Sequence, residues 1–179
     1  VAPTESSVLV SGESGTGKEV FARYIHAQSN RRGGNFVRVA GSGLVGAAAS
    51  AELFGAEEGA SIHYGSLERA NGGTLFIEDV ADIELPLQGR LLSALRHSSF
   101  VRTGGVEPVE FNTRMVAATS RDLPRLTEAG KFREDLFYQL NVVPLHVPAL
   151  RKHREDIPDL LDFYADIMVS QENLTYRRF

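Results

Sequence analysis

Short apolar runs alternate with stretches of helical periodicity along most of the chain. Such runs are typical of buried strands, and the stretches between them gather apolar side chains on one helical face. The expected strands are 7–11, 36–40, 74–79, 113–119 and 142–147, and the expected helices are 18–27, 87–95, 132–140 and 156–169. Because strands that alternate with helices form a parallel sheet with helices on both faces, the pattern predicts an α/β fold.

Two of the expected helices carry an apolar stripe, which predicts a buried face. In the helix 18–27 the stripe consists of Val20, Phe21, Tyr24 and Ile25. In the helix 156–169 it consists of Ile157, Leu160, Leu161, Tyr164, Ile167 and Met168. We therefore expect both helices to pack through these side chains.

The connecting segments carry turn signals. Residues 100–111 contain Gly104-Gly105 between β-prone runs, which predicts a hairpin, whereas the polar segment 56–65 predicts a loop. Pro144 lies inside the last expected strand. Because proline cannot donate a ladder hydrogen bond, we expect this strand at the edge of the sheet.

A glycine-rich segment that ends in a lysine follows the first expected strand. Gly12, Gly17 and Lys18 meet the pattern G-x-x-x-x-G-K. Glycines let the backbone curl so that its N–H groups cradle phosphates, and the following helix N-terminus adds a partial positive charge. A plain glycine-rich turn that caps a helix is the alternative. The phosphate loop expected to bind ATP or ADP comprises Gly12, Glu13, Ser14, Gly15, Thr16, Gly17, Lys18 and Glu19.

Two acids end the expected strand 74–79. In an open α/β sheet, ligands bind at the carboxyl ends of the strands. We expect Glu78 to hold Mg²⁺ and Asp79 to orient the attacking water. Glu19 stands where a Ser or Thr hydroxyl usually binds the metal. The alternative is that the two acids simply cap the junction between strand and loop.

Polar and basic residues farther along the chain complete the candidate site. Ser120 follows the expected strand 113–119 and is a candidate sensor of the γ-phosphate, with a solvated turn as the alternative. Arg133 and Arg151 are candidates for the phosphates of a neighbouring subunit, although a single arginine is more often an ordinary surface residue.

Composition is that of an ordinary globular chain. Apolar residues make up 42% and charged residues 23%, the formal net charge is −4, and cysteine is absent. These values exclude disulfides and give no electrostatic footprint for nucleic acid. We find no membrane-spanning run, no signal peptide and no metal spacing among the five histidines. A cytoplasmic protein is expected, and the Val1 start and polar end predict a fragment of a longer chain.

Several segments together resemble one family. They are Gly12 to Glu19, Glu52 to Gly55, Gly72 to Phe76, Gly130 to Leu136, Pro148 to Arg151 and Glu155 to Ile157. The chain resembles the AAA+ domain of NtrC-type bacterial enhancer-binding activators, which work with sigma-54 polymerase. The resemblance implies a P-loop NTPase core over residues 1–150, then a core–lid linker and the first helix of a truncated helical lid over residues 151–179.

The resemblance also implies partners. Members of this family form rings, usually hexamers, with nucleotide between subunits, and Arg133 lies in the segment that matches the family's arginine finger. We therefore expect a homo-oligomer, a dimer or a ring, joined through the nucleotide interface. RNA polymerase is a candidate partner. DNA would be bound only through a domain outside this chain, and no membrane partner is expected.

The chain departs from the family pattern at several positions. The sigma-54-contacting motif G-A-F-T-G-A is absent, because Gly59-Ala60 is followed by a short segment that ends at Gly65. At the end of the expected strand 74–79, the family has Asp then Glu, whereas this chain has Glu78 then Asp79. Ala40 stands where the family has an asparagine on the second strand, and Ser120 stands where it has its sensor asparagine. Gln139 stands where the family has the second arginine of the finger segment.

These departures resemble the NtrX branch of response regulators. They predict a nucleotide-binding regulatory domain of a two-component transcriptional regulator, with weak or lost hydrolysis and no sigma-54 remodelling loop. A working ATPase motor that remodels sigma-54 polymerase or another protein is the main alternative. A different P-loop NTPase, such as a kinase, is a third hypothesis, although no segment resembles an acceptor-substrate site.

Overall fold

The computed structural model describes residues 1–172 of the chain. The described residues form two compact units, one of residues 1–147 and one that begins at Pro148, and each is described by itself. The division falls shortly before the boundary expected after residue 150. That the second unit begins a helical lid stays a prediction. The expected polar end of the chain, residues 177–179, lies outside the described residues.

A five-stranded parallel sheet forms the centre of the first unit. Its order is β2-β5-β8-β1-β9, so Pro144 lies on the edge strand as expected. The strands are β1 (Val8–Ser11), β2 (Phe36–Ala40), β5 (Thr74–Glu78), β8 (Arg114–Thr119) and β9 (Val143–His146). All run in one direction, so their carboxyl ends share one edge. The predicted α/β fold with a parallel sheet is confirmed.

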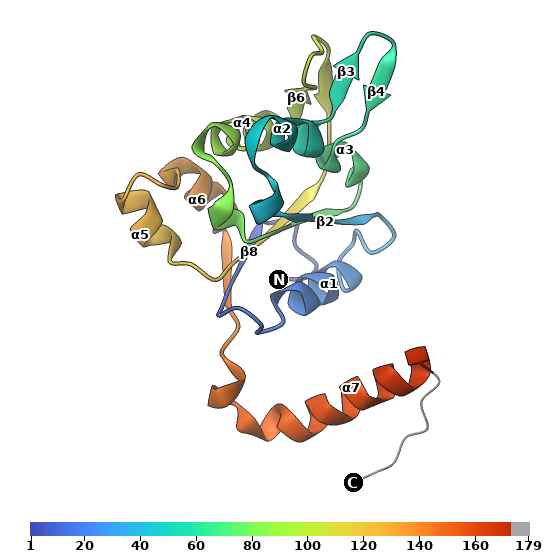
Figure 1. The fold of residues 1–179 in the computed structure, drawn as a ribbon, viewed down its shortest axis with the longest axis vertical. Coiled ribbons are helices and arrows are strands. Elements are labelled where there is room, and N and C mark those ends of the chain that lie inside the picture. The colour runs from blue at the N-terminus through green and yellow to red at the C-terminus, as the bar shows by residue number, and fades with distance from the viewer. Residues whose placement is uncertain (173–179) are drawn as a thin grey trace. The chain divides into compact units, whose positions relative to one another are not determined.

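Helix α1 (Lys18–Ala27) covers one face of the sheet (Figure 1). It packs through Ala22 and Ile25 against apolar side chains of β1, β5 and β8. Of the four residues expected in the apolar stripe, Ile25 is buried, but the prediction is wrong for Val20, Phe21 and Tyr24, which are exposed. The cause lies at the start of the helix. Lys18 turns toward the phosphate loop, and residues 22 and 25, four and seven positions on, therefore face the sheet.

The remaining helices of the first unit pack over the opposite face. Leu75 and Ile77 of β5 and Met115 of β8 point to that side and join the larger apolar core. Helix α5 did not emerge from the hydrophobic pattern, because it is short and only Leu123 is buried. The helices on this side are α2 (Gly46–Phe54), α3 (Ser66–Arg69), α4 (Leu85–His97), α5 (Leu123–Glu128) and α6 (Glu134–Leu140).

Two hairpins project from this helical layer (Figure 1). The predicted hairpin within 100–111 is confirmed as β6 (Ser99–Val101) paired with β7 (Pro108–Glu110). The loop expected at 56–65 is instead a hairpin of β3 (Ala56–Glu58) and β4 (Ser61–His63), whose tip is exposed. The hydrophobic pattern does not predict this strand pairing, because few side chains of β3 and β4 are apolar. A bridge between Ala56 and Thr103 joins the two hairpins.

Helix α7 (Ile157–Glu172) dominates the second unit. It follows two short 3₁₀ turns, η3 (Leu150–Lys152) and η4 (Arg154–Asp156). The predicted helix is confirmed, but the apolar stripe is not buried, since Ile157, Leu161 and Tyr164 are exposed. The side chains of Ile167 and Met168 lie outside the described residues.

Candidate phosphate-binding site

The phosphate loop takes the backbone shape that its glycines allow. Gly15 and Gly17 have φ angles of 80° and 81°, in the left-handed region that side chains disfavour. Gly12 is required for a different reason. A Cβ there would lie 2.6 Å from the carbonyl oxygen of Val147, next to the edge strand β9. The loop is therefore pressed against the sheet and then turns directly into α1.

Lys18 places its ammonium inside this loop. The side chain is buried, and Nζ donates hydrogen bonds to the carbonyl oxygens of Gly12 (3.0 Å) and Glu13 (2.7 Å). Thr16 Oγ1 donates to the same Glu13 carbonyl at 2.9 Å. The cation thus lies against the loop backbone at the N-terminus of α1, where two sources of positive potential add. This arrangement favours a phosphate group.

The loop is fastened to the neighbouring strands at the carboxyl edge of the sheet. The N–H of Gly12 donates to the carbonyl of Thr119 at 3.2 Å, and the N–H of Val147 donates to the carbonyl of Ser11 at 2.8 Å. β8 lies between β1 and β5. The structure therefore brings the phosphate loop, the segment that follows Thr119 and the end of β5 to one edge, as the sequence predicts.

Glu78 makes an ion pair that the sequence analysis did not foresee. Its carboxylate binds the guanidinium of Arg38 on β2, and Arg38 Nε also lies 3.2 Å from Glu19 Oε2. Arg23 binds the same Glu19 carboxylate at 2.7 Å. We call Glu19, Arg23, Arg38 and Glu78 the acid–arginine cluster. Glu78, chiefly through its hydrogen bond, and Glu19 raise the pKa of Arg38, which stays fully charged.

Asp79 is held by its backbone. Its φ angle of 48° is left-handed, and its carbonyl accepts the N–H of Asp82, the last residue of η2 (Val80–Asp82). Gly41 packs so closely that a Cβ on it would lie 2.3 Å from the Asp79 carbonyl oxygen. The main chain that carries the Asp79 carboxylate is therefore fixed on both sides.

The other candidate residues occupy the surface of the first unit or the second unit. Ser120 is exposed directly after β8. Arg133 forms a two-pronged ion pair with Asp135, at 3.0 and 2.8 Å, which raises the pKa of Arg133 and lowers that of Asp135. Arg151 belongs to the second unit. The roles given to these residues stay predictions.

Comparison with known proteins identifies the family. The family described as the Sigma-54 interaction domain matches residues 1–146. The chain belongs to this family. The nitrogen assimilation regulatory protein NtrX of Azorhizobium caulinodans is 44% identical over 180 residues, which cover 99% of this chain and 40% of that protein. The regulatory protein AtoC of Escherichia coli is 44% identical over 176 residues, covering 96% of this chain and 38% of the relative.

Solved structures agree with this assignment. NtrX from Brucella abortus in complex with ATP superposes with a TM-score of 0.92 at 41% identity, over all of this chain and 41% of that one. The same protein with ADP gives a TM-score of 0.93 at 41% identity, with 100% and 40% coverage. This sigma-54 interaction domain chain thus spans about two fifths of the relatives that it matches.

The donor set around Glu78 does not fit a magnesium ion as it stands. The carboxylate expected to hold Mg²⁺ is bound to a guanidinium, and the residue in the usual hydroxyl position, Glu19, binds two. Within residues 1–172, the side chains placed by the structure include no group of three or more His, Cys, Asp or Glu that could hold a metal ion. The expectation that Glu78 binds Mg²⁺ stays a prediction.

Arg38 is the site residue that sequence reasoning missed. The sequence held part of the signal, because residues two apart on a strand share a face: Arg38 with Ala40 on β2, and Phe76 with Glu78 on β5. With Ala40 paired opposite Glu78, Arg38 becomes the diagonal neighbour of Glu78 on the same face. That register depends on the tertiary fold and cannot be read from one strand.

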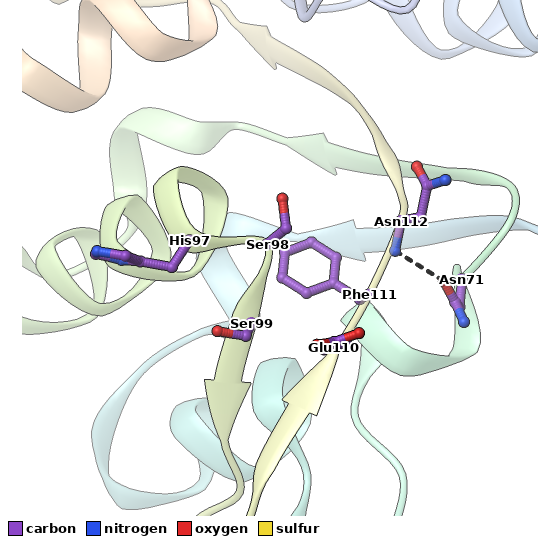
Figure 2. Close-up of a pocket in the computed structure, with 7 residues that line it drawn as sticks. All are labelled: Asn71, His97, Ser98, Ser99, Glu110, Phe111 and Asn112. Carbon is purple, nitrogen blue, oxygen red and sulfur yellow. Dashed lines mark hydrogen bonds between the residues drawn. The ribbon is translucent and has the colours of Figure 1, made fainter.

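A surface cavity of about 560 Å³ lies away from this site (Figure 2). In Figure 2 its side chains surround the ends of β6 and β7, where Asn112 N donates to Asn71 Oδ1 at 2.8 Å. Asn71 lies shortly before β5 and Asn112 shortly before β8, so the cavity adjoins the amino edge of the sheet. It is lined by Asn71, His97, Ser98, Ser99, Glu110, Phe111 and Asn112, none of which belongs to the candidate site. In the described part of the chain, no helix has the length and apolarity to cross a membrane.

Proposed function

We propose that this chain is the ATP- or ADP-binding regulatory domain of a bacterial two-component transcriptional regulator, with weak or impaired ATP hydrolysis. The observation that carries the proposal is the phosphate loop shaped around buried Lys18. The ATP and ADP complexes of Brucella NtrX, at 41% identity, support nucleotide as the ligand. A transcriptional regulator acts at the chromosome, so the proposal places the protein in the cytoplasm.

The geometry of the acids supports impaired hydrolysis. Asp79 has one methylene fewer than the glutamate that the family uses, and its backbone is fixed between η2 and Gly41. The main chain therefore does not bring the shorter Asp79 side chain closer to the phosphates. Displacement of a reacting group by about 1 Å can lower a rate by roughly 10²-fold. Gln139 replaces an arginine of the finger segment and cannot supply a positive charge in the transition state.

The β3–β4 hairpin supports a role other than remodelling sigma-54 polymerase. Its large exposed apolar side chains are Ile62 in β4 and Tyr64 after β4 at the base of the hairpin, which together offer a small surface for gripping a partner. Arg102 ties the base of the hairpin to the body through ion pairs with Glu57 and Glu68. A domain with a fastened hairpin would act through its assembly state, set by bound nucleotide.

The proposal includes partners. Subunits would associate as a dimer or ring through the nucleotide interface, with Arg133 as the candidate contact to a neighbour's phosphates. Its pairing with Asp135 in this chain means that such a contact must replace an internal ion pair. DNA would be bound through a domain outside this chain, and RNA polymerase is a candidate partner.

The alternative is an active ATPase motor that remodels sigma-54 RNA polymerase. Membership of the sigma-54 interaction domain family favours it. So does the β3–β4 hairpin, which projects from the body with an exposed tip instead of packing tightly on the core (Figure 1).

An open-complex assay on a sigma-54 promoter separates the two functions. The complete protein with ATP should occupy the promoter without melting it. Robust melting that is lost in Ile62→Ser or Tyr64→Ser would establish the motor instead. The same preparation should hydrolyse ATP far below an ordinary rate of about 10 per second. Exchanging the acids, Glu78→Asp with Asp79→Glu, should raise turnover by about tenfold or more if the order of the acids limits catalysis.

A further inference from the structure

The acid–arginine cluster lies beside the phosphate loop on the α1 side of the sheet. Glu19 is the residue directly after Lys18, and Glu78 ends β5 on the face that α1 covers. Arg38 connects them, with Nε 3.2 Å from Glu19 Oε2 and a terminal nitrogen bound to Glu78 Oε2. A single guanidinium thus spans the two carboxylates that flank the region where the outer phosphates of a nucleotide would lie.

The charges in this cluster already cancel. Two carboxylates, Glu19 and Glu78, face two guanidiniums, Arg23 and Arg38, so the formal charge is zero. A Mg²⁺ ion in a nucleotide site is normally held by one or two carboxylates together with phosphate oxygens. Here the ion would have to displace Arg38 from Glu78 or enter next to its positive charge, and both cost electrostatic free energy.

Aromatic packing fixes the backbone elements next to Arg38. Phe36, two residues earlier on the same face of β2, stacks on Phe76 at 5.9 Å between ring centroids. The guanidinium of Arg23 lies 4.7 Å from the centroid of the same Phe36 ring. Strands β2 and β5 and helix α1 are therefore packed together, and the half-exposed guanidinium of Arg38 is held by its two ion pairs, with Glu19 and Glu78. A preorganised cation loses little conformational freedom when an anion binds beside it.

We propose that Arg38 supplies, between Glu19 and Glu78, the positive charge that Mg²⁺ supplies in other nucleotide sites of this kind, so that the nucleotide binds almost independently of Mg²⁺. The inference deepens the proposed function and rests on its claim that the chain binds nucleotide. It concerns binding alone and assigns no catalytic step to Arg38, which acts here as a binding and positioning residue.

The test is calorimetric titration of the complete protein with ADP, once in excess Mg²⁺ and once in EDTA. The wild-type dissociation constants should agree within about twofold. In Arg38→Gln, which keeps a polar side chain but removes the charge, affinity in EDTA should fall by about tenfold or more, the effect of one charge-assisted contact. Mg²⁺ should restore part of that loss, because Glu78 is then available to the ion.

Matched variants separate the specific effect from a general one. Arg23→Gln removes a cation from Glu19 but leaves Glu78 paired, so it should bind ADP equally well with and without Mg²⁺. Arg38→Lys keeps one charge and should retain most of the binding in EDTA. Unfolding midpoints of all variants show whether the fold is kept. As a second measurement, Mn²⁺ relaxation with saturating ADP should show tighter metal binding in Arg38→Gln than in the wild type.

Each outcome decides something different. Wild-type binding that weakens more than about tenfold in EDTA would overturn the inference and leave the proposed function standing. An Arg38→Gln variant that folds and shows the wild-type ratio between the two titrations, with unchanged Mn²⁺ affinity, would also overturn it. No binding of ADP by the wild type in either buffer would overturn the proposed function together with the inference.

Discussion

Arg102 holds together three elements on the helical side of the fold. Its guanidinium donates to Glu68 on α3 at 2.9 and 2.6 Å and to Glu57 on β3 at 2.6 Å. The side chains of Arg102 and Glu68 are 13% and 11% exposed, so water screens these contacts poorly. The ring of Tyr64 lies beside the same guanidinium, 5.7 Å from its centroid. The ion triad is therefore the fastening of the β3–β4 hairpin.

Removing the cation should be costly. Arg102→Met leaves two carboxylates close together and largely shielded from water, which for a buried pair costs about 3–5 kcal/mol. Since the Glu57 side chain is 22% exposed, we expect a loss at the lower end of this range, about 3 kcal/mol of unfolding free energy. For a chain of this length that loss corresponds to roughly 6–12 °C in the unfolding midpoint.

Urea and thermal unfolding of the complete protein measure the effect. Arg125→Met is the matched control, because its ion pair with Asp122 is on the surface, with Arg125 84% exposed, and should contribute less than about 1 kcal/mol. A second variant combines Arg102→Met with Glu57→Gln and Glu68→Gln and should recover much of the stability, because no unpaired charge remains. A loss from Arg102→Met no larger than that from Arg125→Met would refute the reasoning.

Two further predictions concern the phosphate loop and the core. Lys18→Ala should weaken ADP binding by more than about tenfold, because it removes a charge-assisted contact with the phosphates; unchanged calorimetric affinity would contradict the assignment of the loop. His26 on α1 hydrogen-bonds Thr74 of β5, and its burial lowers its pKa below 6.5, with Arg114 acting in the same direction and a backbone hydrogen bond with Gly34 acting against it. The unfolded chain therefore binds more protons, so stability should fall as the pH drops through about 6.5, and His26→Gln should flatten this part of the pH profile.

Local signals were enough for the strand, loop and helix around Lys18 and for the sheet. The strand before Gly12, the glycines and Lys18 are contiguous, so their spacing alone predicts strand, loop and helix. The central strands are continuous apolar runs, which is typical of strands buried on both faces. Pro144 even identified the edge strand, because its missing N–H is tolerated only there.

The features that were missed depend on contacts between distant segments. The rotation of α1 follows from Lys18 facing the loop, which outweighs the attraction of Val20, Phe21 and Tyr24 for the core. The β3–β4 hairpin is fastened by Arg102, more than thirty positions away from Glu68 in sequence. The ion pair between Arg38 and Glu78 joins residues forty positions apart. Patterns within a single element carry no information on such pairs.

Single-turnover kinetics test the central claim most directly. The complete protein, in excess over radiolabelled ATP, is mixed and quenched at intervals, so that bound ATP and bound ADP are both counted. We expect that ATP is retained by the wild type, is not retained by Lys18→Ala, and stays largely uncleaved for minutes. Conversion of the bound ATP to ADP at about 10 per second, or equal retention by Lys18→Ala, would contradict a nucleotide-binding domain with impaired hydrolysis.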